Sequence, residues 1–153
     1  MPDERPFIDE FDAQVDAPAA EVFRATTLSV SRIFAGPFSR VFTALLGCAH
    51  RGASYTVPPV AGQESNGFRV AEVGEPERLV LEGRHRFATY RLSFLIEPLG
   101  EKRSRVRART DALFHGWHGA IYRTLVIGSG AHEILAKRML KGIASRADPS
   151  GPR

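Results

Sequence analysis

The chain has 153 residues, of which 43% are hydrophobic, and this size and composition suit one domain with its own core. It contains no run of about 18 apolar residues, so we expect no integral membrane association. The N-terminus is acidic, unlike a secretory signal. By default we expect a protein of a bacterial-type cytoplasm. The net charge of +4 is too small by itself to indicate nucleic-acid binding. The single cysteine, Cys48, excludes an internal disulfide, and we expect it to be buried and inert.

We expect a single domain over residues 7–146, between flexible tails at 1–6 and 147–153. Its first strand is predicted at Glu10–Asp16, where apolar and polar residues alternate and therefore point to opposite faces. A short helix should follow at Ala19–Thr26, since a proline and a preceding aspartate suit the start of a helix.

A second apolar helix is predicted at Phe38–Leu46, and Gly47 should end it. Residues 54–60 contain two adjacent prolines, which lack backbone donors, so we expect at most a short edge strand there. The pattern over residues 27–66 is otherwise the least informative part of the chain.

Two β-hairpins are predicted from Gly67 onward. The first joins strands at Phe68–Val73 and Arg78–Gly83 through a four-residue turn. Pairing residue 73 with residue 78 places Arg69 opposite Glu82, and opposite charges support that register. On the inner face it places Val70 opposite Leu81.

The second hairpin joins strands at Tyr90–Glu97 and Arg103–Phe114. If Glu97 faces Arg105, then Arg91 faces Asp111, so two opposite-charge pairs fall into place together. On the inner face, large side chains of the first strand then lie opposite small side chains of the second, which predicts a trough along the second strand. The alternative is that large and small side chains interdigitate and fill the space. The pairs are Tyr90 with Ala112, Leu92 with Thr110, Phe94 with Ala108, and Ile96 with Val106.

A long C-terminal helix is predicted at 117–144, because apolar residues recur every three or four positions. Gly128 and Gly130 fall in its middle, where each costs about 1 kcal/mol relative to alanine. His132 lies on the apolar stripe itself. We therefore expect this helix to leave room for a molecule between itself and the sheet.

Three segments carry a resemblance to a known superfamily. They are the run from Phe11 to Phe23, the block from Gly67 to Leu92, and the segment from Leu113 to Gly128. The sequence resembles the START-like (SRPBCC) superfamily of polyketide cyclases, birch-pollen-type allergens and lipid-transfer domains, in a poorly characterised bacterial branch. The resemblance implies an α+β helix-grip fold, in which an antiparallel sheet wraps around a long C-terminal helix after two short helices. It implies a hydrophobic pocket and transfers no activity.

We therefore expect a protein that binds a small, mostly apolar molecule, such as a lipid, between sheet and helix. The expected pocket lining is Phe68, Leu81, Tyr90, Leu92, Phe94, Ala108, Thr110, Ile121, Leu125, Gly128 and His132. The loop 84–89 should lie near the start of the long helix and form a polar mouth. The residues of this mouth would be Arg84, His85 and Arg86 of the loop and His118 of the helix. They could bind an anionic or hydrogen-bonding end of the ligand.

An enzyme of the aromatase/cyclase or small-hydrolase type is the main alternative, working through His132 or the end with His85 and His118. No catalytic motif is present, so no catalytic residue is assigned. A site of His85, His115 and His118 is the only metal arrangement to consider, and no cysteine or acidic ligand spacing supports it. We expect no metal and no cofactor.

Four arginines, at positions 103, 105, 107 and 109, fall on one face of a predicted strand. Nucleic acid would need interleaved aromatic residues or a basic helix, and neither is present, so we expect no nucleic-acid partner. A solvated sheet face is the simplest interpretation. A partner-binding module using this face is a second alternative. The oligomeric state is open, with a homodimer among the arrangements to consider.

Overall fold

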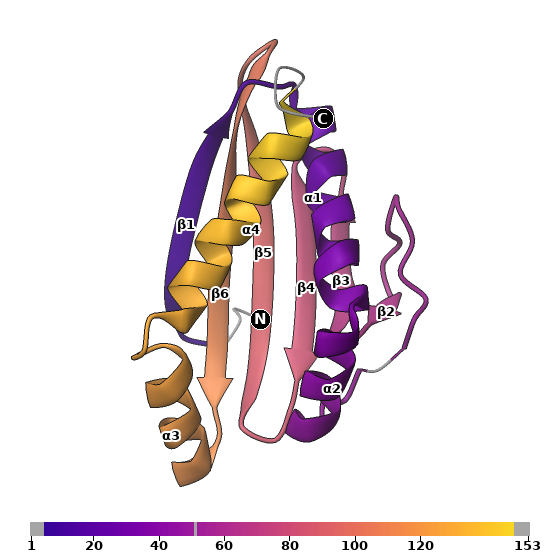
Figure 1. Ribbon diagram of the computed structural model, residues 1–153. Coiled ribbons are helices and arrows are strands. Elements are labelled where there is room, and N and C mark those ends of the chain that lie inside the picture. Colours follow the sequence, from indigo (N-terminus) through magenta and orange to yellow (C-terminus); the bar gives the residue numbers. More distant parts are fainter. Residues whose placement is uncertain (1–4, 51, 149–153) are drawn as a thin grey trace.

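A computed structural model describes residues 5–50 and 52–148. Within them the chain forms a six-stranded antiparallel sheet with the strand order β1-β6-β5-β4-β3-β2, together with four helices (Figure 1). The strands are β1 (Phe7–Val15), β2 (Glu64–Ser65), β3 (Phe68–Gly74), β4 (Arg78–Arg84), β5 (Ala88–Gly100) and β6 (Arg103–Phe114). The helices are α1 (Ala19–Ala35), α2 (Pro37–Leu46), α3 (Gly116–Val126) and α4 (Ala131–Ala147).

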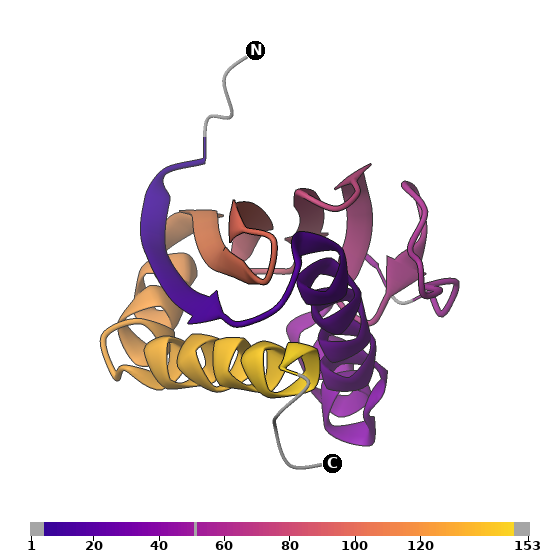
Figure 2. The ribbon, with the colours of Figure 1, turned by 90° about the horizontal axis from the view of Figure 1, so that it is seen from above.

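The molecule has two layers, a curved sheet and the helices on its concave side (Figure 2). Helix α4 crosses the concave face in front of β5 and β6, and α1 lies beside it (Figure 1). The Arg146 guanidinium of α4 donates a hydrogen bond of 2.9 Å to Ser29 Oγ of α1 and so joins the two helices. The architecture is the α+β helix grip expected from the sequence.

The register predicted for the β5–β6 hairpin is confirmed over most of its length, whereas that predicted for the β3–β4 hairpin is confirmed only at Arg69–Glu82 and Val70–Leu81. In the β5–β6 pair, Glu97 lies opposite Arg105 and Arg91 opposite Asp111. In the β3–β4 pair, Arg69 lies opposite Glu82. The pairing predicted at the turn is wrong by one residue, since residue 73 pairs with residue 79. A β-bulge between Val70 and Glu72 inserts the extra residue, which alternation alone does not reveal.

The first helix is longer than predicted. It continues past Thr26 to Ala35, because Val30 and the residues around it keep a buried face against the sheet and α4. Helix α2 agrees with the prediction, and Gly47 ends it with φ at 65°, the left-handed conformation that glycine adopts without strain.

The edge strand expected at residues 54–60 is wrong. The pairing strand is instead Glu64–Ser65, whose partner is β3. Residues 54–60 form a loop. The side chain of Gln63 bridges two of its backbone groups, because Oε1 accepts hydrogen bonds from the N–H groups of Thr56 and Val60. The prolines in this loop leave few donors for a ladder.

The single helix expected at 117–144 is also wrong. It is two helices, because α3 ends at Val126 and α4 begins at Ala131. Gly130 has φ at +75°, which a right-handed helix cannot contain. The spacing of apolar residues in the sequence continues across the break, so it gave no sign of two helices. Gly128 and Gly130 lie in the link between α3 and α4.

Candidate functional site

The concave face of the sheet has a closed part and an open part. Phe94 and Ala108, which face each other on β5 and β6, are no more than 2% exposed beneath α1 and α4. Further along the same strands, Tyr90, Leu92 and Thr110 are only half-buried. Solvent therefore reaches the middle of the inner face, in a region that we call the open end.

A row of aromatic rings borders the open end. Phe34 of α1 contacts Phe68 of β3 with ring centroids 4.3 Å apart, and Phe68 meets Tyr90 at 5.1 Å. The row continues from Tyr90 to His85 at 5.4 Å and from His85 to Tyr122 of α3 at 5.0 Å. Five separate segments thus contribute one ring each to a continuous wall of mostly apolar surface.

Tyr90 is fixed in this row by a hydrogen bond and by a glycine. Its hydroxyl donates a hydrogen bond of 2.6 Å to the carbonyl of Gly67. Its ring lies across Gly83 of the neighbouring strand, where a side chain would leave it no room. Burial raises the pKa of the Tyr90 hydroxyl, and Cys48 beside it adds to the rise. The phenol is therefore neutral and serves as a structural donor.

A polar cluster lies on the other side of the open end. His132 Nε2, at the start of α4, is 3.1 Å from Asp9 Oδ2 of β1 and 3.3 Å from Thr110 Oγ1 of β6. Because both contacts use Nε2, the carboxylate favours a proton on that nitrogen, which leaves Nδ1 as the acceptor. This arrangement brings an imidazole, a hydroxyl and a carboxylate from three elements together beside the open end.

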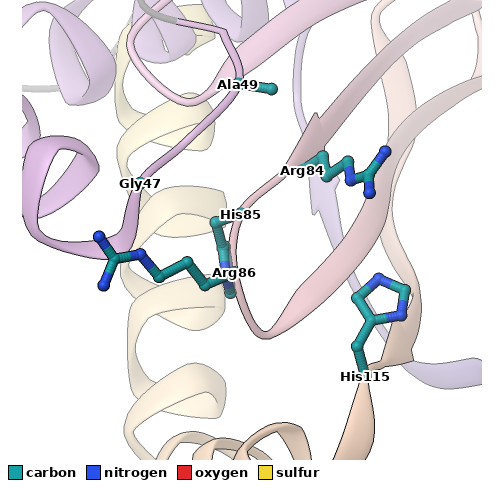
Figure 3. A pocket seen from close by; sticks show the side chains of 6 residues that line it. All are labelled: Gly47, Ala49, Arg84, His85, Arg86 and His115. Atoms are coloured by element: carbon teal, nitrogen blue, oxygen red, sulfur yellow. The ribbon is translucent and has the colours of Figure 1, made fainter.

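The loop between β4 and β5 forms a separate hollow of about 310 Å³ at the end of the sheet (Figure 3). Arg84 and His115 lie on one side of the loop, and Arg86 extends the other way, beside Gly47 (Figure 3). His115 Nε2 is 2.9 Å from Thr89 Oγ1, which holds the imidazole at the start of α3. Apart from Ala49 and Gly47, the lining consists of side chains that are cationic or can become so.

His85 lies between the hollow and the aromatic row. It is 6% exposed, and its Nδ1 accepts a hydrogen bond of 3.1 Å from the backbone N–H of Phe87. Burial and, to a smaller extent, the neighbouring His115 lower the pKa of His85 to about 4. The side chain is therefore neutral near pH 7 and contributes an apolar ring rather than a charge to the wall.

The structure divides the eleven residues expected to line a pocket into three groups. Five lie at the open end: Phe68, Tyr90, Leu92, Thr110 and His132. Three are in the closed core: Leu81, Phe94 and Ala108. The other three lie away from the interior on α3 and the turn after it, where they are exposed: Ile121, Leu125 and Gly128.

The last group is misplaced for the same reason that the helix prediction fails. Gly128 lies in the exposed link between two helices, so it leaves no space against the sheet. A leucine at this position would not fill the interior.

The predicted mouth is mostly brought together. Arg84, His85 and Arg86 line the hollow, whereas His118 lies outside it, against Trp117 and Phe87. His115 takes its place. The proximity expected between loop 84–89 and the start of the long helix is confirmed, since the His115 N–H donates a hydrogen bond of 2.8 Å to the carbonyl of Phe87.

The arginine face of β6 is neutralised by carboxylates. Arg103 pairs with Asp16, and Arg109 with Asp111, each at 3.0 Å. Arg105 and Arg107 share Glu97, at 3.7 and 3.0 Å. Among the described residues, no three His, Cys, Asp or Glu side chains converge as a metal site would require, and no helix is long and apolar enough to cross a membrane.

Sequence reasoning missed Asp9, Phe34 and Tyr122. Asp9 could have been found by continuing the alternation of the first strand back by two residues, which places it on the inner face with Phe11. Phe34 lies beyond the predicted end of the first helix. Tyr122 lies off the apolar stripe of the predicted long helix, so no pattern pointed to it.

No protein-family model matches the sequence, and no curated protein matches it. Solved structures do match. The chain is similar to Mll3558 of Rhizobium loti with a TM-score of 0.58, 14% identity, and coverage of 90% of this chain and 94% of that one. It is also similar to a START superfamily protein of Mycobacterium smegmatis, with a TM-score of 0.51, 17% identity, and coverage of 90% and 97%. The chain adopts the START-like helix-grip fold.

A third match is BexL, a di-domain ARO/CYC from the BE-7585A biosynthetic pathway. The TM-score is 0.51 and the identity 17%, over 89% of this chain and 44% of BexL. At these identities the likeness concerns the fold alone.

Proposed function

We propose that this START-like domain binds a small, mostly apolar molecule at the open end of its concave face. The observation that carries the proposal is the partial exposure of Leu92 and Thr110 in the middle of an inner sheet face, where their neighbours Phe94 and Ala108 are buried. Inner-face apolar surface left in water is unfavourable, by about 25 cal/mol per Å². A ligand that covers it gains that free energy.

The side chains that border the open end indicate the chemical class of the ligand. The aromatic row offers flat apolar surface on one side, which favours a ring system or an acyl chain. His132 and Thr110 offer one acceptor and one hydroxyl on the other side. A mostly apolar molecule with one hydroxyl or keto group meets both walls. Arg84 and Arg86 lie beyond the aromatic row and suit an anionic substituent at its far end.

Fluorescence titration with N-phenyl-1-naphthylamine, a neutral apolar probe, tests the proposal. Thr110→Trp should fill the open end and weaken binding at least about tenfold, because one indole occupies the space of the probe. Leu113→Trp places the same side chain on the exposed outer face of the same strand and should leave binding unchanged. Equal binding by both folded variants would overturn the proposal.

A general acid-base enzyme is the second candidate, and the contact between Asp9 and His132 favours it. A carboxylate that holds Nε2–H leaves Nδ1 available to take a proton from a bound substrate. Hydrolysis of p-nitrophenyl butyrate provides a first test. Activity that falls together in His132→Gln and Asp9→Asn would support the enzyme. Undiminished turnover in His132→Gln would exclude it.

A further inference from the structure

One end of the molecule combines exposed apolar helix faces with basic loops. Helix α3 exposes Trp117, Ile121 and Leu125, four residues apart and therefore on one face, with exposed fractions of 68%, 51% and 65%. Helix α2 exposes Val41 and Leu45 in the same spacing. Both helices lie at the same end of the molecule, on either side of the β4–β5 loop (Figure 1).

The charged side chains of α2, the β4–β5 loop and α3 have one sign. Arg84 ends β4 and Arg86 lies in the loop that follows it, and Arg123 projects from α3 over the ring of Phe114. No aspartate or glutamate occurs in residues 22–63, 83–96 or 112–132, which supply α2, the loop and α3. These three arginines therefore contrast with those of β6, each of which has a carboxylate partner.

We propose that this end docks on an anionic lipid bilayer, with the exposed faces of α2 and α3 in the headgroup region and the arginines against lipid phosphates. Apolar residues including a tryptophan on one helix face, flanked by basic residues, are typical of helices that lie in a membrane interface. The surface shares Arg84 and Arg86 with the far end of the proposed ligand site, whereas Trp117 and Leu125 lie on an exposed helix face outside that site.

Other occupants fit the surface less well. A symmetric contact with a second copy brings identical patches together, so Arg84, Arg86 and Arg123 would meet the same cations of the partner. Nucleic acid would use aromatic rings for stacking, but Ile121 and Leu125 are aliphatic. A bilayer with anionic lipids can bury the apolar helix faces and pair its phosphates with the arginines.

Co-sedimentation with vesicles tests the proposal. Wild type should bind vesicles of phosphatidylcholine with phosphatidylglycerol, bind phosphatidylcholine alone more weakly, and release as salt rises. The double variant Arg84→Gln/Arg86→Gln should lose about fivefold per arginine, or about 25-fold. The double variant Trp117→Ser/Leu125→Ser should lose at least about tenfold.

Matched controls locate the effect. Arg105→Gln/Arg107→Gln removes the same two charges from the sheet face, and Leu99→Ser removes an exposed apolar residue from the opposite end; both should bind within about twofold of wild type. Absence of binding to anionic vesicles would overturn the proposal, and so would equal losses in the two arginine double variants. A dimer that Trp117→Ser/Leu125→Ser dissociates, without vesicle binding by wild type, would assign the surface to a second copy. Probe binding to Trp117→Ser/Leu125→Ser reports separately on the ligand site.

Discussion

The ring of Tyr90 lies so close to Gly83 that a methyl group on the glycine would be 2.2 Å from Tyr90 Cζ. The two residues pair across β4 and β5, and the tyrosine reaches over its partner to the carbonyl of Gly67. The missing side chain at Gly83 therefore sets the position of the aromatic row that borders the open end.

Gly83→Ala should destabilise the fold by about 1–3 kcal/mol, the usual cost of overpacking, and should displace the tyrosine ring. Urea unfolding measures the first effect and the near-ultraviolet circular dichroism of Tyr90 the second. Gly100→Ala is the control, because a side chain there meets nothing within 4 Å. Equal stability of the two variants would mean that Tyr90 is not held against Gly83.

Leu81 and Leu92 are direct partners on β4 and β5 and differ in burial, since Leu81 is 1% exposed and Leu92 is half-buried. Leu81→Ala should cost about 2–5 kcal/mol. Leu92→Ala should cost about half as much, because part of its side chain is already in water. Chemical denaturation of both variants gives the comparison. If Leu92→Ala costs as much as Leu81→Ala, the inner face is closed there and the ligand site is lost.

Acid should destabilise the protein through His85. Burial and the nearby His115 lower its pKa from 6.5 to about 4, so the unfolded chain takes up a proton before the native state does. Stability is therefore unaffected by this group above pH 6.5 and falls as the pH drops from 6.5 towards 4, by about 3 kcal/mol in total.

His85→Asn retains an acceptor for the Phe87 N–H and removes the titration. Unfolding free energies of wild type and His85→Asn should converge, or cross, between about pH 7 and pH 4.5 as wild type loses stability faster. A constant difference across this range would show that His85 is not held neutral by the fold.

The link between α3 and α4 depends on the backbone of Gly130. Gly130→Ala should cost about 1–2 kcal/mol from the left-handed conformation alone, because its side chain would meet nothing within 4 Å. Ser129→Ala, one residue earlier, should be close to neutral. Thermal unfolding distinguishes them, and a stabilised Gly130→Ala would indicate that α3 and α4 form one continuous helix in solution.

Period-two alternation and charge pairing were enough to predict the two hairpins, but not the short edge strand β2. Glu97 opposite Arg105 and Arg69 opposite Glu82 fixed two registers, and the inner-face pair of Leu92 with Thr110 followed directly. The bulge at β3 was hidden because an extra residue changes the register without leaving a distinctive side chain.

The break before α4 was hidden for a different reason. Helical periodicity continues through Gly128 and Gly130. The two glycines were equally consistent with a helix that lacks side chains over a cavity and with a turn between two helices. The turn removed Ile121 and Leu125 from the site. Alternation along the first strand could place Asp9 on the inner face, but no local pattern reports its contact with His132, which is 123 residues away.

The most direct test of the central claim is to titrate the methyl-labelled protein with N-phenyl-1-naphthylamine and follow methyl chemical shifts by NMR. The resonances of Leu92 and Thr110 should move with saturation, while those of Leu99 and Val60, which are exposed elsewhere, should stay fixed. Shifts confined to α3, or no saturable shift at Leu92 and Thr110, would contradict a ligand site at the open end of the concave face.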